Sequence, residues 1–457
     1  MSTTSQARLD LRRLRLELAG EVIGPDDAAY DAARRVFLPT FDKRPAAIVR
    51  PVDDAAVASV VALARENGIE LAVRDGGHSM AGHSATDGGL VLDLAWLDDL
   101  EIDANAGVAT VSAGLTAGHV TKEAGERGLS IGFGDTGSVG IGGLTLGGGV
   151  GYLVRKQGLM IDSLLSARVV TADGRVLDVA ASNHPDLFWA IRGGGGNFGV
   201  VTRFRYRLHP DEGGTGGMLV LPATPDTLVA FVQAANEAPD ELSTIANVMP
   251  APPMPFLAKE HHGRPVLLAM LFHAGPRDDA QRALAPFRSI AEPLADLLRP
   301  LSYAEMYPPE NGGGMRASGR TLFVDGLDRG VAAEILGRLA ASTAQMRAAQ
   351  LRVLGGAMAR VPADATAFAH RGRRIMVNLG AVYASPEETP VHEAWLDAFA
   401  ESLSGPNGDA YVNFLGDDGA ERVRDAYPGE TWNRLREVKR RYDPDNFFRL
   451  NHNVPPA

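Results

Sequence analysis

The chain has 457 residues, enough for two or three domains that each bury a hydrophobic core. Its formal net charge of −11 argues against nucleic acid or an anionic membrane as the main partner. It contains no cysteine, which excludes disulfides, thiolate metal sites and cysteine nucleophiles. Its 52 glycines exceed the usual share for a chain of this length.

The N-terminal segment predicts an amphipathic helix over residues 5–18. Arg12 and Arg13 form a twin arginine, but a secretion signal would continue with an apolar run, and Arg15 and Glu17 follow instead. No stretch of the sequence approaches the ~20 apolar residues of a membrane span. We therefore expect a cytoplasmic protein without a membrane partner.

The first half of the chain alternates short strands with helices. A helix is expected after the capping residue Asp53, with Gly68 just beyond its end. Residues 167–179 predict a hairpin with Asp173-Gly174 as a two-residue turn. The other elements expected here are strands at 69–73, 90–94, 108–112 and 200–208 and helices at 116–127 and 186–192.

The composition changes near residue 210, where residues 211–214 indicate a linker. Beyond it, strands alternate with longer helices, and a loop at 307–316 is long enough to line a pocket. This pattern predicts a sheet covered on one face by helices. We expect strands at 218–222, 265–273, 350–359 and 374–383, and helices at 225–237, 277–297, 328–346 and 388–403. The tail predicts a helix from Thr431 to Arg441, followed by Phe447 and Phe448 as buried anchors.

The glycines are concentrated in three segments. Residues 74–89, 128–151 and 193–199 together hold 21 of the 52 glycines. Glycine lets the backbone approach a ligand closely, and successive N–H groups in a turn bind anions. One such segment would indicate only a tight turn in a compact core, but three indicate one extended polar cofactor.

Two of these segments match the dinucleotide-binding fingerprint, at Gly132-x-Gly134-x-x-Gly137 and Gly194-x-Gly196-x-x-Gly199. The first should open a helix, yet the glycines between 140 and 149 disfavour one. The second follows a predicted helix and leads into a strand, which reverses the required order. We therefore do not expect a Rossmann site. The sequence also lacks a P-loop, a nucleophile elbow and an HExxH motif, and no nearby carboxylate completes a metal site with His78 and His83.

A known family carries the same motifs. Residues 74–79 read Arg74-Asp75-Gly76-Gly77-His78-Ser79, which resembles a flavin-attachment motif. Further matching segments follow in family order at 134–149, 155–159, 186–200, 411–413 and 442–448. Through them the chain resembles the berberine-bridge-enzyme-like FAD-linked oxidases of the vanillyl-alcohol-oxidase/PCMH flavoprotein superfamily. The middle of the chain matches only in general pattern.

The resemblance implies an α+β fold. A PCMH-type FAD-binding domain of two α+β subdomains would be joined by a substrate domain with an antiparallel sheet covered by helices. The expected boundaries are 1–39 for an N-terminal helical segment of the FAD domain, 40–210 for the FAD-binding domain, 211–405 for the substrate domain, and 406–457 for a segment that returns to the FAD domain.

The resemblance also implies how FAD is held. His78 would bond covalently through a ring nitrogen to the 8α carbon of the flavin. Some relatives carry a second bond from a cysteine, but Thr136 stands at that position in this cysteine-free chain, so a singly attached FAD is expected. Backbone N–H groups of 75–79 and 136–143 would hold the pyrophosphate, and the backbone of Val200 would contact the adenine side. The other cofactor-binding residues implied are Arg74, Asp75, Gly76, Gly77, Ser79, Thr136, Gly137, Ser138, Gly140, Gly142, Gly143 and Asn451.

A Tyr-x-Asn motif at Tyr411 and Asn413 marks the expected catalytic residues. In relatives that oxidise sugars and alcohols, this tyrosine takes the proton from the substrate hydroxyl. A tyrosine has an ordinary pKa near ~10, so Tyr411 would need a positive neighbour or a linked acid. Asn413 would orient the ring or the substrate. Phe368, His370 and Tyr307 are weaker pocket candidates, for which a core or surface role is equally expected.

The expected function is an FAD-linked oxidase that takes hydride from a CH–OH group of a small alcohol, sugar or secondary metabolite to flavin N5. The electrons would pass to O2. Two variants stay open: a C–N (amine) oxidase of the hydroxynicotine-oxidising type, and a dehydrogenase with another acceptor. A reductase fed by NAD(P)H is disfavoured, because that branch of the superfamily lacks the attachment histidine. The expected partner is a small-molecule substrate, with no nucleic acid and no metal, and a homo-oligomer is compatible with the sequence.

Overall fold

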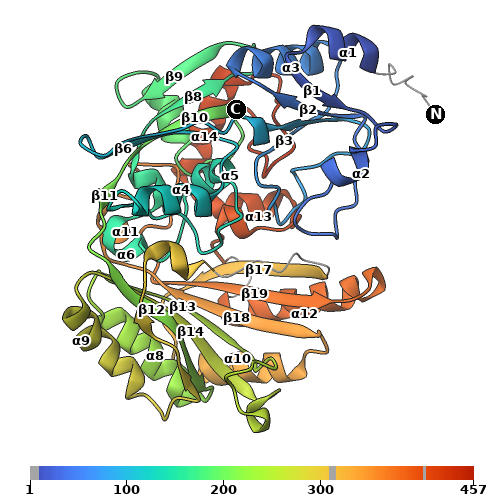
Figure 1. The fold of residues 1–457 in the computed structure, drawn as a ribbon. Coiled ribbons are helices and arrows are strands. Elements are labelled where there is room, and N and C mark those ends of the chain that lie inside the picture. Colours follow the sequence, from blue (N-terminus) through green and yellow to red (C-terminus); the bar gives the residue numbers. More distant parts are fainter. Residues whose placement is uncertain (1–9, 308–314, 405–407) are drawn as a thin grey trace.

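The computed structural model describes residues 10–307, 315–404 and 408–457. They form two lobes (Figure 1), in which the N-terminal half and the C-terminal helices build the upper lobe and residues from β12 to α12 build the lower lobe. The upper lobe holds a four-stranded sheet, a five-stranded sheet and a short two-stranded sheet, and the lower lobe holds one large antiparallel sheet, so the α+β fold is confirmed. No helix in the described part of the chain is long and apolar enough to cross a bilayer.

A four-stranded sheet of order β1-β2-β4-β3 forms the N-terminal part of the upper lobe. Asp53 accepts the backbone N–H of Ala56 and so caps α3, as predicted. The elements are α1 (Leu11–Glu17), β1 (Gly20–Ile23), α2 (Tyr30–Ala33), β2 (Ala47–Pro51), α3 (Asp54–Glu66), β3 (Leu71–Arg74) and β4 (Leu90–Asp93). Helix α1 confirms the last part of the predicted first helix, whose residues 5–9 lie outside the described residues.

A five-stranded antiparallel sheet of order β5-β6-β10-β8-β9 follows. In β10, Phe204 and Tyr206 are buried while Arg205 and Arg207 are exposed, as the alternation predicts. The elements of this part are β5 (Leu100–Asp103), β6 (Val108–Ser112), α4 (Ala117–Gly125), β7 (Leu129–Ser130), α5 (Ile141–Gly147), α6 (Val154–Gln157), β8 (Leu164–Val170), β9 (Val176–Ala180), α7 (Pro185–Ala190), β10 (Val200–Arg207) and β11 (His209–Pro210).

The β8–β9 hairpin is confirmed, but its turn is not the predicted two-residue one. The loop spans residues 171–175, and the backbone N–H of Thr171 donates to the carbonyl of Arg175 at 3.0 Å. Gly174 adopts a φ of +78°. A longer turn with one glycine in the left-handed region fits this spacing, because it adds a bulge to a tight turn.

The glycine-rich segment after residue 140 is helical, which corrects the sequence-based expectation. A Cβ on Gly142 would lie 2.7 Å from Asp75 Oδ2, and a Cβ on Gly147 would lie 2.0 Å from Asn413 Oδ1. These contacts require glycine and hold α5 in place, so tertiary packing outweighs the low helix propensity of glycine. A Rossmann turn is still not formed, since β7 before it pairs antiparallel with β11.

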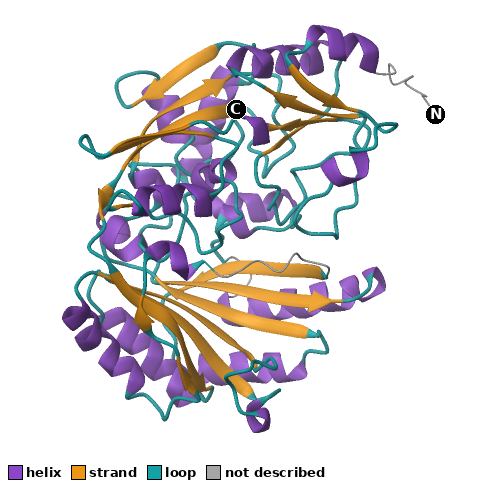
Figure 2. Cartoon of the chain, viewed as in Figure 1, coloured by secondary structure: helices purple, strands orange, loops and turns teal. Residues whose placement is uncertain are grey.

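The lower lobe is built on a sheet of order β15-β12-β14-β13-β18-β19-β17, with β16 also paired to β12. Helices cover one face of this sheet, and the other face looks toward the upper lobe (Figure 2). The elements are β12 (Gly214–Pro222), α8 (Pro225–Glu237), β13 (Leu242–Pro250), β14 (Pro265–Ala274), α9 (Arg277–Arg288), β15 (Ala295–Asp296), β16 (Arg299–Pro300), β17 (Arg316–Val324), α10 (Arg329–Ala341), β18 (Met346–Val353), α11 (Ala357–Arg360), β19 (Ile375–Tyr383) and α12 (Thr389–Ser404).

Several elements of the lower lobe depart from the prediction. Strands β13 and β17 are not predicted at all, and β18 begins four residues earlier than expected. Helices α9 and α10 end earlier than predicted, because the residues after α9 pair with β12 as β15 and β16, and those after α10 enter β18. Most of the predicted loop 307–316 lies outside the described residues, and Arg316 begins β17.

The C-terminal tail lies against the upper lobe. It contains α13 (Gly419–Ala426) and α14 (Glu430–Tyr442). Leu435, Val438, Tyr442 and Phe448 join the same hydrophobic core as the two small sheets. The prediction that an aromatic tail docks on the rest of the chain is therefore confirmed for Phe448, while Phe447 packs at the edge of the core.

Candidate active site

A cavity of about 420 Å³ lies among the glycine-rich segments of the upper lobe. Its wall is shared by the loop after β3, the loop that leads into α5, the turn before β10 and two parts of the tail. A volume of this size falls in the range of ligand sites in proteins. The predicted site residues in this wall are Asp75, Gly76, Gly77, His78, Ser79, Thr136, Gly140, Gly142, Gly143, Val200, Tyr411, Asn413 and Asn451.

His78 stands in the cavity wall at the end of the turn that follows β3. Phe37 stacks on its ring, with the ring centroids 4.0 Å apart and the planes inclined by 20°. Its Nε2 lies 2.8 Å from the Oγ of Ser138. Ser138 is not itself in the wall, so the structure connects it to the cavity through the imidazole. The two contacts fix the orientation of the His78 ring.

Asp75 carries a carboxyl group that is buried against the start of α5. Its Oδ2 accepts the backbone N–H of Gly142, whereas its Oδ1 has no hydrogen-bond partner among the described residues. Burial raises the pKa of Asp75 to about 8, although backbone N–H groups of Gly142 and Gly143 favour the ionised form. A Cβ on Gly140 would lie 2.1 Å from Oδ1, and a Cβ on Gly76 would lie 2.3 Å from the Gly140 nitrogen. Only glycines allow the two loops to approach this closely.

Two predicted cofactor-binding residues lie behind the wall. The buried guanidinium of Arg74 pairs with Oδ2 of Asp93 at 2.9 Å. This ion pair stabilises the end of β3, directly before the turn that contains His78. A Cβ on Gly137 would lie 3.4 Å from the side chain of Tyr307, so Gly137 faces away from the cavity. Thr136, in contrast, belongs to the wall itself.

Tyr411 presents its hydroxyl group to a small polar cluster in the wall. The backbone N–H of Gly149 and the Nδ2 of Asn413 each donate to Tyr411 Oη at 3.0 Å. Burial raises the pKa of Tyr411 to about 12, while these two donors and the nearby charge of Arg352 favour its ionised form. Asn413 also donates to the carbonyl of Leu144 at 3.0 Å, which joins the motif to α5.

The three weaker pocket candidates do not line the cavity. Phe368 packs against Tyr411, with ring centroids 5.8 Å apart. The Nε2 of His370 lies 3.1 Å from the carbonyl of Ala426. The hydroxyl of Tyr307 lies 3.3 Å from the Oγ1 of Thr121. Of the three, only Phe368 contacts a side chain of the wall.

Comparison with known proteins identifies the family. A model of the FAD binding domain matches residues 45–180, and a model described as berberine and berberine like matches residues 410–455. The chain is 32% identical over 463 residues to (R)-6-hydroxynicotine oxidase of Paenarthrobacter nicotinovorans, which covers 96% of this chain and 98% of that protein. The chain belongs to the berberine-bridge-enzyme-like FAD-linked oxidases.

Solved structures share the fold of this oxidase. 6-Hydroxy-D-nicotine oxidase from Arthrobacter nicotinovorans superposes with a TM-score of 0.87 at 29% identity, over 97% of this chain and 99% of the other. Glucooligosaccharide oxidase from Acremonium strictum, whose FAD is described as 6-S-cysteinyl and 8α-N1-histidyl, gives a TM-score of 0.85 at 23% identity, over 96% and 97%. The protein is thus an FAD-linked oxidoreductase, and the matched FAD binding domain lies within the part of the chain predicted to bind FAD.

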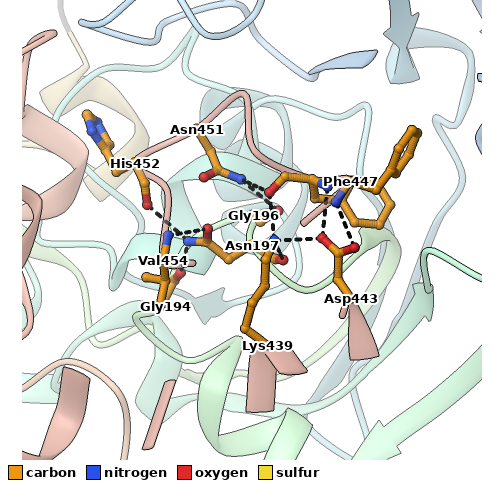
Figure 3. Close-up of polar contacts among 10 residues, drawn as sticks. Gly194, Gly196, Asn197, Lys439, Asp443, Phe447, Asn451, His452 and Val454 are labelled. Atoms are coloured by element: carbon orange, nitrogen blue, oxygen red, sulfur yellow. Dashed lines mark hydrogen bonds and ion pairs between the residues drawn. The ribbon is translucent and has the colours of Figure 1, made fainter. Parts of the chain in front are cut away.

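A buried ion pair fastens the tail of the oxidase (Figure 3). Lys439 Nζ donates to Asp443 Oδ2 at 2.6 Å and to the carbonyls of Asn197 at 2.7 Å and Phe448 at 2.8 Å. All three ammonium protons therefore have acceptors. Asp443 in turn accepts the backbone N–H groups of Phe447 and Phe448. Both charged side chains are 0% exposed, so the pair is stable only because every one of these bonds is made.

Two asparagines connect this tail to the third glycine-rich segment (Figure 3). Asn197 donates to the carbonyl of His452 at 3.1 Å and accepts the backbone N–H of Val454 at 2.9 Å. Asn451 donates to the carbonyl of Gly196 at 3.3 Å. Asn451 thereby stands in the cavity wall, and its Oδ1 is buried without a hydrogen-bond partner in the described part of the chain.

Two further contacts at the cavity form only in the folded chain and follow from no motif in the sequence. His83 and His452 meet edge to face, with ring centroids 4.9 Å apart, and burial lowers their pKa values to about 4 and about 3. Arg352 of β18 donates to Asp135 Oδ2 at 2.6 Å and lies over the ring of Phe414 at 5.0 Å. No spacing rule brings these residues together, since each pair joins distant segments. Among the described residues, no group of three or more His, Asp or Glu side chains could hold a metal ion.

The residues of the cavity wall fit FAD. Gly143 and Gly196 belong to the wall, and no heavy atom in the described ranges lies within 4 Å of a Cβ built on either. Bare backbone therefore faces open space along the cavity, as a long polar ligand requires. The Oδ1 atoms of Asp75 and Asn451, which have no hydrogen-bond partner among the described residues, are suited to hydroxyl groups of such a ligand. A buried acceptor without a hydrogen bond is energetically costly, and a hydroxyl donor from the ligand would remove that cost.

Proposed function

We propose that this oxidase holds one FAD covalently through His78 and oxidises a CH–OH group of a small molecule. The observation that carries the proposal is that His78, Tyr411 and all three glycine-rich segments border one cavity. When bound, FAD supplies an acceptor for a hydride, that is, for two electrons. The remaining steps belong to the side chains of this chain.

We assign the attachment bond to a ring nitrogen of His78 and the 8α carbon of the flavin. Phe37 and Ser138 orient the ring for this bond. A second bond from a cysteine cannot form, because the chain contains none and Thr136 stands in the wall. His78 would therefore be the sole covalent tether, unlike the doubly attached FAD named for the Acremonium enzyme.

We assign the role of base to Tyr411. Its oxygen receives N–H groups from Gly149 and Asn413, and Arg352 adds a positive charge nearby, so all three stabilise the phenolate. The phenolate would take the proton from the substrate hydroxyl as the C–H bond is broken. Asn413 acts as a positioning residue, because it binds both Tyr411 Oη and the carbonyl of Leu144.

A C–N oxidase is the second candidate function. It is favoured by the relative at 32% identity, which is named for oxidation of hydroxynicotine. We take O2 as the electron acceptor, with a dehydrogenase using another acceptor as the alternative. The cytoplasmic location, the absence of a nucleic-acid partner, a homo-oligomer and the domain boundaries at 210/211 and 405/406 also stay predictions.

The decisive experiment is acid precipitation of the purified protein. A yellow pellet is expected, because a covalent bond survives denaturation of the fold. His78→Ala should leave the pellet colourless while flavin appears in the supernatant. The matched control His184→Ala, at the start of α7 and outside the cavity, should keep the yellow pellet. A colourless pellet from flavin-replete wild-type protein would contradict the attachment. A screen of alcohols, sugars and amines that follows bleaching and peroxide would then separate the two candidate functions.

A further inference from the structure

Two histidines outside the attachment motif meet in the wall of the cavity. His83 stands on the loop that follows the attachment turn, and its backbone N–H donates to the Oγ of Ser79 at 3.1 Å. His452 stands on the C-terminal tail, next to Asn451 (Figure 3). The two rings lie edge to face, with centroids 4.9 Å apart, and both side chains are only half-buried because they border the cavity. We call His83 and His452 the histidine pair.

The wall of the cavity carries no fixed positive charge. The described residues that line it include neither lysine nor arginine. Of its two carboxyl groups, Asp135 is paired with Arg352, and Asp75 is largely uncharged at pH 7 because burial raises its pKa to about 8. The side chains in this wall that can become positive near neutral pH are therefore histidines. His78 is assigned to the flavin bond, which leaves the histidine pair.

Without an anionic ligand, burial keeps the histidine pair neutral at pH 7. It lowers the pKa of His83 to about 4 and that of His452 to about 3. Other groups change these values less: Asp417 favours the charged form of His83 and Lys43 opposes it. The charge of His83 opposes that of His452, whereas the backbone of Leu415 favours it. Two rings in contact can therefore share one proton but resist a second.

FAD would bring two negative charges into this wall on its diphosphate. Backbone N–H groups in the glycine-rich turns can bind phosphate oxygens, but they add no net charge. A negative charge within ~4–6 Å raises the pKa of a neighbouring histidine by about 1–3, which would bring that of His83 to about 5–7. The diphosphate and the proton then stabilise each other in the cavity, because the coupling between two bound species is reciprocal.

We propose that the histidine pair takes up one proton from solvent when FAD enters the cavity, and so balances one of the two charges of the diphosphate. This inference rests on the proposed placement of FAD in this cavity. The loading of FAD is then linked to pH, since binding strengthens as the pH falls through the range in which the pair is protonated only with FAD bound. The bond at His78 afterwards retains the cofactor at any pH.

The test uses His78→Ala protein, whose FAD can be removed and returned. FAD is titrated into this protein by calorimetry in buffers that differ in ionisation enthalpy, which measures the number of protons taken up. At about pH 6 we expect uptake that approaches one proton per FAD. Between about pH 7 and about pH 5, the Kd for FAD should fall by up to about tenfold per pH unit. Asp75 stays protonated in this range because its pKa of about 8 lies above it.

Variants of the histidine pair separate charge from shape. His83→Gln and His452→Gln, combined in the His78→Ala protein, keep polar side chains that cannot be protonated. Both the proton uptake and the pH dependence of the Kd should be lost. The control His209→Gln removes another histidine whose pKa burial lowers, but which lies outside the wall beside the Oγ of Ser163 at 3.0 Å. This control should keep both effects.

Ring-carbon NMR of wild-type protein with attached FAD provides a readout that needs no removal of the cofactor. One histidine signal, assigned to the pair by its loss in His83→Gln or His452→Gln, should show a charged ring at pH 5 and a neutral ring at pH 8. Two neutral rings at pH 5, FAD binding without proton uptake, or uptake that persists in the double variant would overturn the proposal. A colourless acid pellet from wild-type protein would instead contradict the attachment at His78, and the proton uptake would be judged separately.

Discussion

The two sides of the active site carry their polar groups in different ways. On the cofactor side, loops meet through bare glycine backbone, and a Cβ on Gly140 would lie 2.1 Å from Asp75. On the sheet side, side chains project from straight strands, and partners such as Asn247 and Gln350 meet because the strands are in register. Backbone contacts of the first kind constrain residue type strongly, whereas a sheet surface tolerates many side chains. The comparison predicts that substitutions on the cofactor side change flavin chemistry or stability, and those on the sheet side change substrate choice.

Tyr411→Phe should have the largest effect, because Tyr411 lies where the two sides meet. The variant keeps the ring contacts with Phe368 and Phe414 but loses the oxygen that accepts from Gly149 and Asn413. We expect flavin reduction by substrate to slow by about 10²–10⁴-fold, as for loss of a general base. Rapid-mixing absorbance under anaerobic conditions measures the rate, with the flavin still attached.

The pH dependence of the same rate gives an independent readout. Because burial raises the pKa of Tyr411 to about 12, the fraction of phenolate grows with pH throughout the neutral range. The wild-type rate should rise by up to about tenfold per pH unit and the Tyr411→Phe rate should not. Tyr442→Phe is the control, since it removes a hydroxyl bonded to Asp186 outside the cavity. An unchanged rate in Tyr411→Phe would eliminate this residue as the base.

Lys439→Met tests how strongly the tail is held to the cofactor side. The variant leaves Asp443 buried without its counter-charge, which should lower the free energy of unfolding by about 3–5 kcal/mol. Lys122→Met removes a pair of the same i,i+4 spacing from the exposed face of α4 and should leave the unfolding midpoint almost unchanged. Urea unfolding midpoints compare the two variants. Equal decreases of the unfolding midpoint in the two variants would mean that burial of the Lys439–Asp443 pair does not contribute to stability, and this would contradict the expected difference between the buried and the exposed pair.

Asp75→Asn should have a smaller, pH-dependent effect on the cofactor side. The pKa of Asp75 is raised from 3.8 to about 8 in the folded chain, so the folded state binds more protons and stability falls as pH rises between these values. The variant removes this penalty. Between about pH 6 and about pH 8, wild-type protein should lose about 2–3 kcal/mol relative to Asp75→Asn. Denaturant midpoints at the two pH values provide the measurement. If the midpoints of the two proteins change equally with pH, the raised pKa of buried Asp75 is contradicted.

Much of the cofactor side could be predicted from the sequence. The motif around His78, the two loops rich in glycine and the Tyr-x-Asn pair all reach one cavity. Local rules also locate α3 and α8 well, because Asp53 and Thr224 cap them. The same rules fail at α5, where glycine propensity argues against a helix that contacts with Asp75 and Asn413 stabilise. They also miss β13, whose residues are mostly buried on both faces and therefore show no simple alternation.

The sequence by itself determined the family, the α+β class and the residues that must lie near FAD, because each depends on a local pattern that only a few residue types satisfy. Only the tertiary structure decided which side chains face the cavity and what they meet there. Arg74 and Gly137 belong to the motifs but lie behind the wall, while Asn451 reaches it through the buried pair of Lys439 and Asp443. Asn247, Gln350 and Asn378 stand opposite one another only once strands distant in sequence are in register, since no local rule reports which residues will be paired across strands.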